Sequence, residues 1–119
     1  MSKTRIMLYV EDVDQLATFW QTAFHAQLVT VNALPAGYHN PIVAISDQVE
    51  LALFPRDFIR QYSPEVLDAG VPSLMFFRSD FADLHARLPH AGEIVETNGV
   101  RTFNFTDPAG NYFVVAEED

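Results

Sequence analysis

The sequence contains 119 residues, a length that suits one domain with a hydrophobic core but not two independent domains. Hydrophobic residues make up 49% and charged residues 19%, which excludes a disordered chain, and the lack of cysteine excludes disulfides, thiolate zinc sites and cysteine nucleophiles. The net charge of −9 argues against a nucleic-acid partner, because phosphates require clustered Lys and Arg, and is compatible with a cationic ligand.

The first half of the sequence predicts a β-α-β-β-β order. Residues 4–10 form an apolar strand, and Asp12 then offers an N-cap for a helix that ends near Phe24. Apolar residues in this helix recur at spacings of three and four, so Trp20 and Phe24 are expected to pack against a sheet. Strands are expected at 27–34, 41–46 and 48–54, with a break at Pro35-Ala36-Gly37.

The second half repeats this order at an offset of 68 residues, which aligns Met7 with Met75 and Asp12 with Asp80. Strands are expected at 73–78, 93–97, 100–106 and 111–117, and a helix capped by Asp80 ends near Leu88. The dipeptide Asn98-Gly99 predicts a two-residue hairpin turn. We therefore expect one domain over residues 1–119, with a first module at about 1–54, a linker at 55–70 containing a short helix near 64–69, and a second module at about 71–119.

Alternation along the strands divides each strand into two faces. One face is purely apolar and is expected to pack under the helices. The other face is also mostly apolar but carries isolated polar side chains, namely Arg5, Glu50, Ser73 and Tyr112. An apolar surface with a few polar groups is typical of a ligand pocket. The alternative is that Arg5 and Glu50 lie at strand ends in solvent.

Several aromatic residues share the pocket side, where they would form walls for a flat or cationic ligand. They are Tyr9, Phe54, Phe77 and Tyr112, accompanied by Met7 and Met75. Phe103 and Phe105 share another strand face, from which they either stack on a planar ligand or pack in the core. His39 lies in a loop that we place near the mouth of the cavity.

The motifs RIMLYVEDVDQLATFW, its second copy SLMFFRSDFAD and the closing segment FNFTDPAGNYFVVAEE resemble the vicinal oxygen chelate superfamily. This superfamily includes glyoxalase I, bleomycin-resistance proteins and extradiol dioxygenases. The resemblance covers essentially the whole chain. It implies an α+β fold in which two β-α-β-β-β modules form a curled eight-stranded mixed sheet around a cavity, and it implies a homodimer.

Metal-dependent members of the superfamily hold a divalent ion with His, Gln or Glu from the first and last strands of both modules. The resemblance places these positions at Arg5, Glu50, Ser73 and Val114. Glu50 alone keeps a ligand type, since arginine has no lone pair to offer and valine has no donor atom. We expect no metal and no other cofactor, and we expect Arg5 either to neutralise Glu50 or to contact an anionic group of the ligand.

These observations favour a metal-free protein that sequesters an aromatic or cationic small molecule in a dimeric cleft, although enzymatic activity stays open. One alternative is a metal-dependent glyoxalase-like isomerase, lyase or dioxygenase whose ligands are misaligned here, with Glu50 and His39 in its site. Another is a dimerisation module without a ligand, whose cavity Met7 and Met75 would fill. The sequence shows no signal peptide and no apolar run of about 18 residues, so we expect a cytoplasmic protein with no membrane partner.

Overall fold

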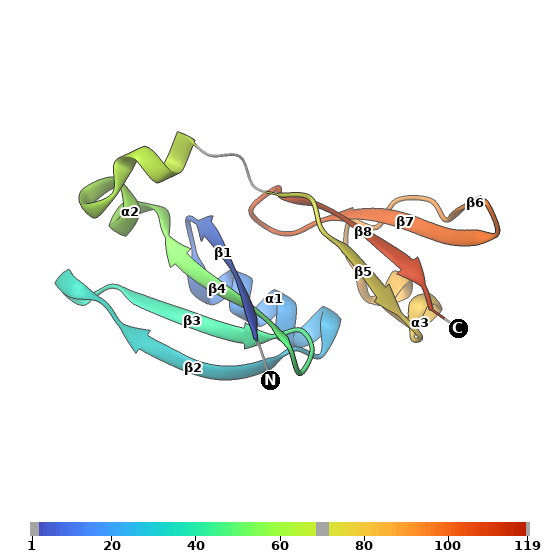
Figure 1. Ribbon diagram of the computed structural model, residues 1–119, viewed down its shortest axis with the longest axis horizontal. Helices are drawn as coiled ribbons and strands as arrows, with labels where there is room; N and C mark the ends of the chain where they lie inside the picture. Colours follow the sequence, from blue (N-terminus) through green and yellow to red (C-terminus); the bar gives the residue numbers. More distant parts are fainter. Residues whose placement is uncertain (1–2, 69–71, 119) are drawn as a thin grey trace. The chain divides into compact units, whose positions relative to one another are not determined.

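The computed structural model describes residues 3–68 and 72–118. Contacts within the chain divide it into two compact units, Met1–Val71 and Pro72–Asp119, which we call unit 1 and unit 2. Both units contain the predicted β-α-β-β-β order (Figure 1), so the predicted α+β class with eight strands is confirmed. The expectation that residues 1–119 act as a single domain stays a prediction.

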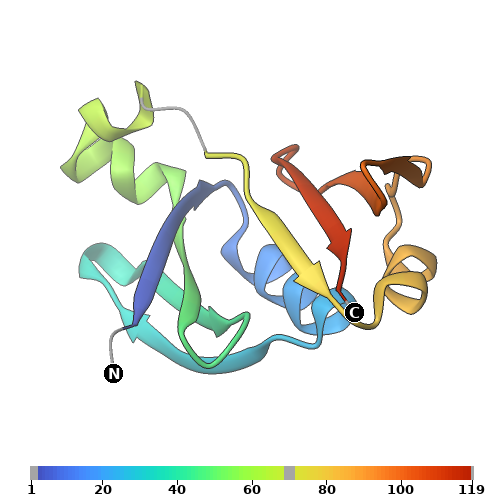
Figure 2. The same cartoon turned by 45° about the vertical axis from the view of Figure 1, so that its right-hand side comes forward.

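Unit 1 forms a four-stranded mixed sheet in the order β1-β4-β3-β2, in which β1 and β4 are parallel and the other neighbours are antiparallel. Helix α1 lies against one face of this sheet (Figure 2). The elements of unit 1 are β1 (Thr4–Val10), α1 (Val13–Phe24), β2 (Gln27–Ala33), η1 (Pro35–Gly37), β3 (His39–Ala44), β4 (Val49–Pro55), α2 (Arg56–Tyr62) and η2 (Pro64–Asp68).

The core of unit 1 lies between α1 and the apolar strand face. Asp12 caps the helix as predicted, because its carboxylate accepts a hydrogen bond from the Gln15 N–H at 3.0 Å. Trp20 and Phe24 are buried with their ring centroids 4.9 Å apart, which confirms their predicted place in the core. The strand residues that meet the helix are also fully buried, namely Leu8, Val10, Leu51 and Leu53.

Unit 2 repeats the topology, with the strand order β5-β8-β7-β6 and a parallel β5–β8 pair. Asn98 and Gly99 both have positive φ, 55° and 80°, which confirms the predicted two-residue hairpin turn. Phe103 and Phe105 are each 1% exposed, so they are core residues and not a surface for a planar ligand. The elements of unit 2 are β5 (Met75–Arg78), α3 (Phe81–Arg87), β6 (Val95–Thr97), β7 (Val100–Thr106) and β8 (Tyr112–Glu117).

Several local predictions differ from the structure. Strands β5 and β6 begin at Met75 and Val95, each two residues after the predicted start, so Ser73 lies before β5. The segment after β4 begins with α2, a helix that we did not predict, and the short helix expected near 64–69 is the 3-10 helix η2; residue 69 lies outside the described residues. Strand β3 begins at His39, two residues before the predicted start. Asp80 is at the N-cap position of α3 but makes no side-chain cap, because its carboxylate accepts hydrogen bonds from Arg78 and Arg87.

Each sheet has a second face, opposite the helix. In unit 1 we call it the Arg5 face, and it carries Arg5, Met7, Tyr9, Glu50 and Phe54; in unit 2 we call it the Met75 face, and it carries Met75, Phe77, Tyr112 and Val114. No helix in the described part of the chain is both long and apolar enough to cross a lipid bilayer.

Candidate functional site

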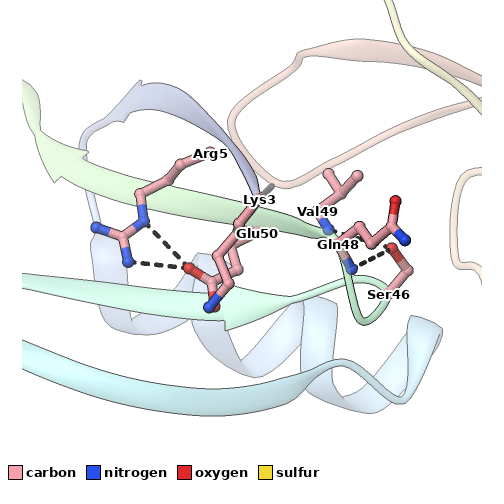
Figure 3. Close-up of polar contacts among 6 residues, drawn as sticks. All are labelled: Lys3, Arg5, Ser46, Gln48, Val49 and Glu50. Atoms are coloured by element: carbon pink, nitrogen blue, oxygen red, sulfur yellow. Dashed lines mark hydrogen bonds and ion pairs between the residues drawn. The ribbon is translucent and has the colours of Figure 1, made fainter. Parts of the chain in front are cut away.

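Arg5 and Glu50 are direct partners in the parallel register of β1 and β4, and Glu50 binds two cations (Figure 3). Arg5 donates from Nε and Nη2 to Glu50 Oε1 at 3.1 and 2.9 Å. Lys3, two residues earlier on the same side of the chain, donates from Nζ to Glu50 Oε2 at 2.9 Å. Both carboxylate oxygens of Glu50 are therefore engaged by side chains of the same unit.

The environment of Glu50 keeps it ionised. The residue is 3% exposed, and a lone carboxylate at that burial would be costly. Hydrogen bonds from Lys3 and then Arg5 outweigh the desolvation and lower the pKa of Glu50 below its ordinary value. The two cations extend outward, with side chains 52% and 47% exposed. The interpretation of Glu50 as a solvent-exposed strand end is therefore wrong, and the predicted pairing with Arg5 is present.

The residues at the metal positions of the superfamily do not fit a divalent ion. Arg5 brings a positive charge to the position of a ligand, and Glu50 has no oxygen that is not already hydrogen-bonded to a cation. Val114 has no side-chain donor atom. Over residues 3–68 and 72–118, no group of three or more His, Asp or Glu side chains is placed to hold a metal ion.

The equivalent positions of unit 2 are also poor in donor atoms. Met75 is the partner of Val114 in the parallel β5–β8 pair, whereas its counterpart Met7 is the partner of Ala52. By register, the counterpart of Glu50 is therefore Tyr112, two residues before Val114. The Ser73 hydroxyl donates to the Tyr112 carbonyl oxygen at 3.5 Å, and the Tyr112 hydroxyl oxygen accepts from Asn104 Nδ2 at 3.2 Å. Neither position supplies a carboxylate.

Large apolar side chains are exposed on both faces. On the Met75 face, Met75, Phe77 and Tyr112 are 53%, 58% and 57% exposed. On the Arg5 face, Met7 is 48% exposed. The rings of Tyr9 and Phe54 lie on the same face with centroids 6.2 Å apart. Exposed apolar groups that cluster on one sheet face, as they do on each of these two faces, are typical of binding sites.

His39 does not join the Arg5 face. Its Nε2 atom lies 2.9 Å from Asp14 Oδ1, in the first turn of α1. The helix covers the opposite side of the sheet, so the structure does not bring His39 and Glu50 together. It is Asn40, the next residue along β3, that points toward the Arg5 face, because neighbouring strand residues alternate.

Sequence reasoning missed Lys3 and Asn40. Lys3 has the same parity as Arg5, and that alternation was a signal that both cations lie beside Glu50. Asn40 is 4% exposed; its Nδ2 donates to the Leu53 carbonyl at 2.8 Å, and its Oδ1 accepts from Asn32 Nδ2 at 3.2 Å. A lone Asn in the loop just before a predicted strand carries no comparable signal.

The sequence matches a known family over nearly its whole length. The family model of the Glyoxalase/Bleomycin resistance protein/Dioxygenase superfamily matches residues 4–115. The chain therefore belongs to this superfamily, as its motifs indicated. No curated protein sequence matches the chain significantly.

Solved structures similar to this chain have the same fold. TnmS3, described as an antibiotic binding protein from Streptomyces sp. CB03234, is 18% identical with a TM-score of 0.76, over 100% of this chain and 97% of its own. A superfamily member from Sphaerobacter thermophilus DSM 20745 is 18% identical with a TM-score of 0.77, over 99% and 98%. The fosfomycin resistance protein FosX from Listeria monocytogenes is 12% identical with a TM-score of 0.73, over 100% and 94%. At these identities the similarity shows the fold alone.

Proposed function

We propose that this protein binds and sequesters a small aromatic molecule without a metal ion and without transforming it. In this proposal the ligand contacts the apolar sheet faces, in a cleft completed by a second copy of the chain. The residues assigned to ligand contact are those of the sequence analysis: Arg5, Met7, Tyr9, Glu50, Phe54, Ser73, Met75, Phe77, Tyr112 and Val114. The structure gives His39 a different contact, and we leave it out of this set.

The engagement of Glu50 by Lys3 and Arg5 carries the proposal. A carboxylate that ligates a divalent ion needs a free lone pair directed at the metal. Here both oxygens of Glu50 accept hydrogen bonds from cationic side chains. To bind a metal, Glu50 would have to leave two ion pairs while its cationic partners repelled the ion. Metal-assisted chemistry at this position is therefore disfavoured by the donor set itself.

The exposed side chains support an aromatic ligand. Phe77 and Tyr112 present ring surface on the Met75 face, and aromatic rings stack well on planar molecules. Met7 and Met75 are about half exposed. This exposure supports a ligand-binding surface and disfavours the alternative of a dimerisation module whose cavity the two methionines fill. A cationic ligand is less favoured beside Glu50, because that carboxylate already has two cationic partners.

The enzymatic alternative requires a different donor set. A glyoxalase-like isomerase, lyase or dioxygenase would need ligands from other residues, and His39 is held by Asp14 on the helix side of the sheet. The names of similar structures include an antibiotic binding protein and a resistance protein. These names support binding as the first function to test.

A thermal-shift screen of small aromatic molecules, performed with and without EDTA, tests the proposal. A ligand at about 100 times its Kd stabilises the folded form by about 2.7 kcal/mol, which raises Tm by several degrees. We expect hits whose Tm shift is unchanged by EDTA and that are recovered intact after incubation with the protein. Ligands that bind only after a divalent metal is added, or that are converted to products, would contradict the proposal.

A further inference from the structure

Two neutral polar side chains on the Met75 face of unit 2 are hydrogen-bonded to each other. Asn104 Nδ2 donates to the Tyr112 hydroxyl oxygen at 3.2 Å, and both residues are exposed. Asn104 alternates along β7 with Phe103 and Phe105, which are buried on the helix side, so its side chain lies on the Met75 face. The strand register agrees, because Asn104 is the direct partner of Val114.

The surroundings of this pair are apolar and exposed. Val114 lies between Asn104 and Met75, because it is the partner of both in its two neighbouring strands. Met75, Phe77 and Tyr112 are each more than half exposed. In a binding site, a few polar groups within an apolar surface fix the orientation of the ligand. The Asn104–Tyr112 pair is therefore placed to orient an aromatic ligand on this face.

Strands β5–β8 place no charged residue on the Met75 face. The charged residues of these strands form two cross-strand pairs, Arg78 with Glu117 and Glu96 with Arg101. Alternation puts both pairs on the helix side, where the Arg101 guanidinium lies 5.1 Å from the centroid of the Phe81 ring of α3. An ion that left water for the Met75 face would meet no opposite charge on these strands, which is costly. The face therefore suits a neutral polar group of a ligand.

The backbone at Asn104 is held at both edges of β7. One edge pairs with β8, and at the other edge the Gly92 N–H donates to the Asn104 carbonyl oxygen at 2.7 Å. His85 of α3 in turn holds this segment, since its Nε2 lies 2.9 Å from the Gly92 carbonyl oxygen. Glycine permits the close approach, because a Cβ at residue 92 would lie 3.3 Å from the Asn104 carbonyl oxygen. A polar group on a strand held in this way loses little freedom when it binds a ligand.

The pair keeps hydrogen-bonding capacity for a ligand. An amide side chain offers a carbonyl acceptor as well as its N–H donors, and a phenol offers one O–H donor. Over residues 3–68 and 72–118, the bond between Asn104 and Tyr112 is the only hydrogen bond of either side chain, which leaves Asn104 Oδ1 and the Tyr112 O–H available. On the Arg5 face, by contrast, the buried polar groups of Glu50 and Asn40 already have protein partners.

We propose that Asn104 and Tyr112 recognise a carboxamide or lactam group of the ligand. The Tyr112 O–H donates to the ligand carbonyl oxygen and the ligand N–H donates to Asn104 Oδ1, while the aromatic ring of the ligand contacts Met75 and Phe77. This inference rests on the proposed function and adds the chemical class of the ligand, a planar aromatic amide. It also adds Asn104 to the ligand contacts, a residue that the sequence analysis does not assign.

Two probes with the same ring test this assignment: naphthalene carboxamide and the matching methyl ketone, in which a methyl group replaces the amino group. Both probes carry the carbonyl acceptor, but only the carboxamide carries an N–H donor. In NMR spectra of protein grown with isotope-labelled asparagine, the side-chain amide signals of Asn104 are those that disappear in the variant Asn104→Leu. We expect the carboxamide to shift these signals saturably in the wild type.

Three variants measure the two hydrogen bonds separately. Asn104→Leu keeps the shape of the side chain without its polar atoms, so we expect it to weaken binding of the carboxamide about fivefold and of the ketone less than about twofold. Retained binding of the ketone also shows that this variant is folded. Tyr112→Phe keeps the ring and should weaken binding of both probes about fivefold. Tyr62→Phe is the matched control, because Tyr62 is 48% and Tyr112 57% exposed, and it should leave both affinities unchanged.

Any of three results would overturn the inference: equal weakening of the two probes by Asn104→Leu, unchanged affinities in Tyr112→Phe, or no saturable shift of the Asn104 signals in the wild type. None of these decides whether the protein binds aromatic molecules, which the thermal-shift screen tests separately. Conversely, metal-independent hits in that screen that all lack an amide group would keep the proposed function and remove this assignment.

Discussion

Arg5 and Glu50 lie directly opposite each other in the parallel β1–β4 pair, with Arg5 Nη2 2.9 Å from Glu50 Oε1. The superfamily resemblance places metal ligands at these same two positions. In this chain Arg5 occupies one of them and Glu50 the other. The Arg5 guanidinium and the Lys3 ammonium donate hydrogen bonds to the two carboxylate oxygens of Glu50. At these positions the chain forms an ion-pair cluster of Lys3, Arg5 and Glu50.

Glu50 and Arg5 should be energetically coupled. Glu50→Gln leaves Lys3 and Arg5 as close cations with no carboxylate between them, so we expect it to lower Tm more than Arg5→Gln does. In a double-mutant cycle measured by urea unfolding, the double variant should lose less stability than the sum of the single losses. Glu65→Gln, at an exposed position, is the control and should change stability by less than about 0.5 kcal/mol. Simple additivity of Glu50→Gln and Arg5→Gln would contradict the coupling.

Asn40→Ala should destabilise the protein by about 1–3 kcal/mol, because it leaves the Leu53 carbonyl without its side-chain donor in a buried place. Asn32 is exposed, and Asn32→Ala removes only the hydrogen bond from Asn32 Nδ2 to Asn40 Oδ1. This variant should cost less than about 1 kcal/mol. Chemical denaturation of both variants measures the difference. Equal losses would show that burial of Asn40 is not the deciding factor.

Asp80 should make stability depend on acid pH. Burial favours its neutral form, but hydrogen bonds from Arg87 and Arg78 outweigh this and lower the pKa of Asp80 below its ordinary value. Its contribution is complete above the unfolded pKa, about 3.9, and is lost as pH falls through the lower folded pKa. We expect wild type to exceed Asp80→Asn by about 1 kcal/mol at neutral pH, with the gap closing below about pH 4. A gap that widens in acid would have the wrong sign.

Phe77→Ala should separate binding from stability. Phe77 is 58% exposed, so we expect its removal to change the free energy of unfolding by less than about 0.5 kcal/mol while weakening binding of an aromatic ligand. Phe105→Ala, in the core of the same unit, should cost about 3–5 kcal/mol. Urea unfolding and ligand titration of each variant provide the test. A large loss of stability in Phe77→Ala would mean that this ring is buried in an assembly.

The architecture was predictable because periodicity and turn chemistry agree along the chain. Asp12 caps its helix, Asn98-Gly99 forms the expected hairpin turn, and the alternation of Leu51 and Leu53 with Glu50 assigns the faces of β4. The repeat placed Met7 and Met75 at equivalent positions, each paired with the last strand of its unit.

Features set by tertiary contacts were not predictable to the same extent. The capping pattern suggested that Asp80 would bond the backbone of α3, but Arg78 and Arg87 compete for its carboxylate. Helix α2 follows Pro55 and has Asp57 in its first turn and Arg60 in its last, a charge pattern that fits the helix dipole. The sequence predicts a linker in this segment, and this pattern alone did not reveal the helix. His39 was assigned to a cavity mouth because the sequence does not reveal its contact with Asp14.

The most direct test is whether Glu50 binds a metal ion or is paired only with Lys3 and Arg5. Equilibrium dialysis of the purified protein against nickel, zinc and manganese, followed by elemental analysis, measures this. We expect far less than one bound ion per chain, with no change in Glu50→Ala. Near-stoichiometric metal that Glu50→Ala removes would contradict a site held by Lys3 and Arg5.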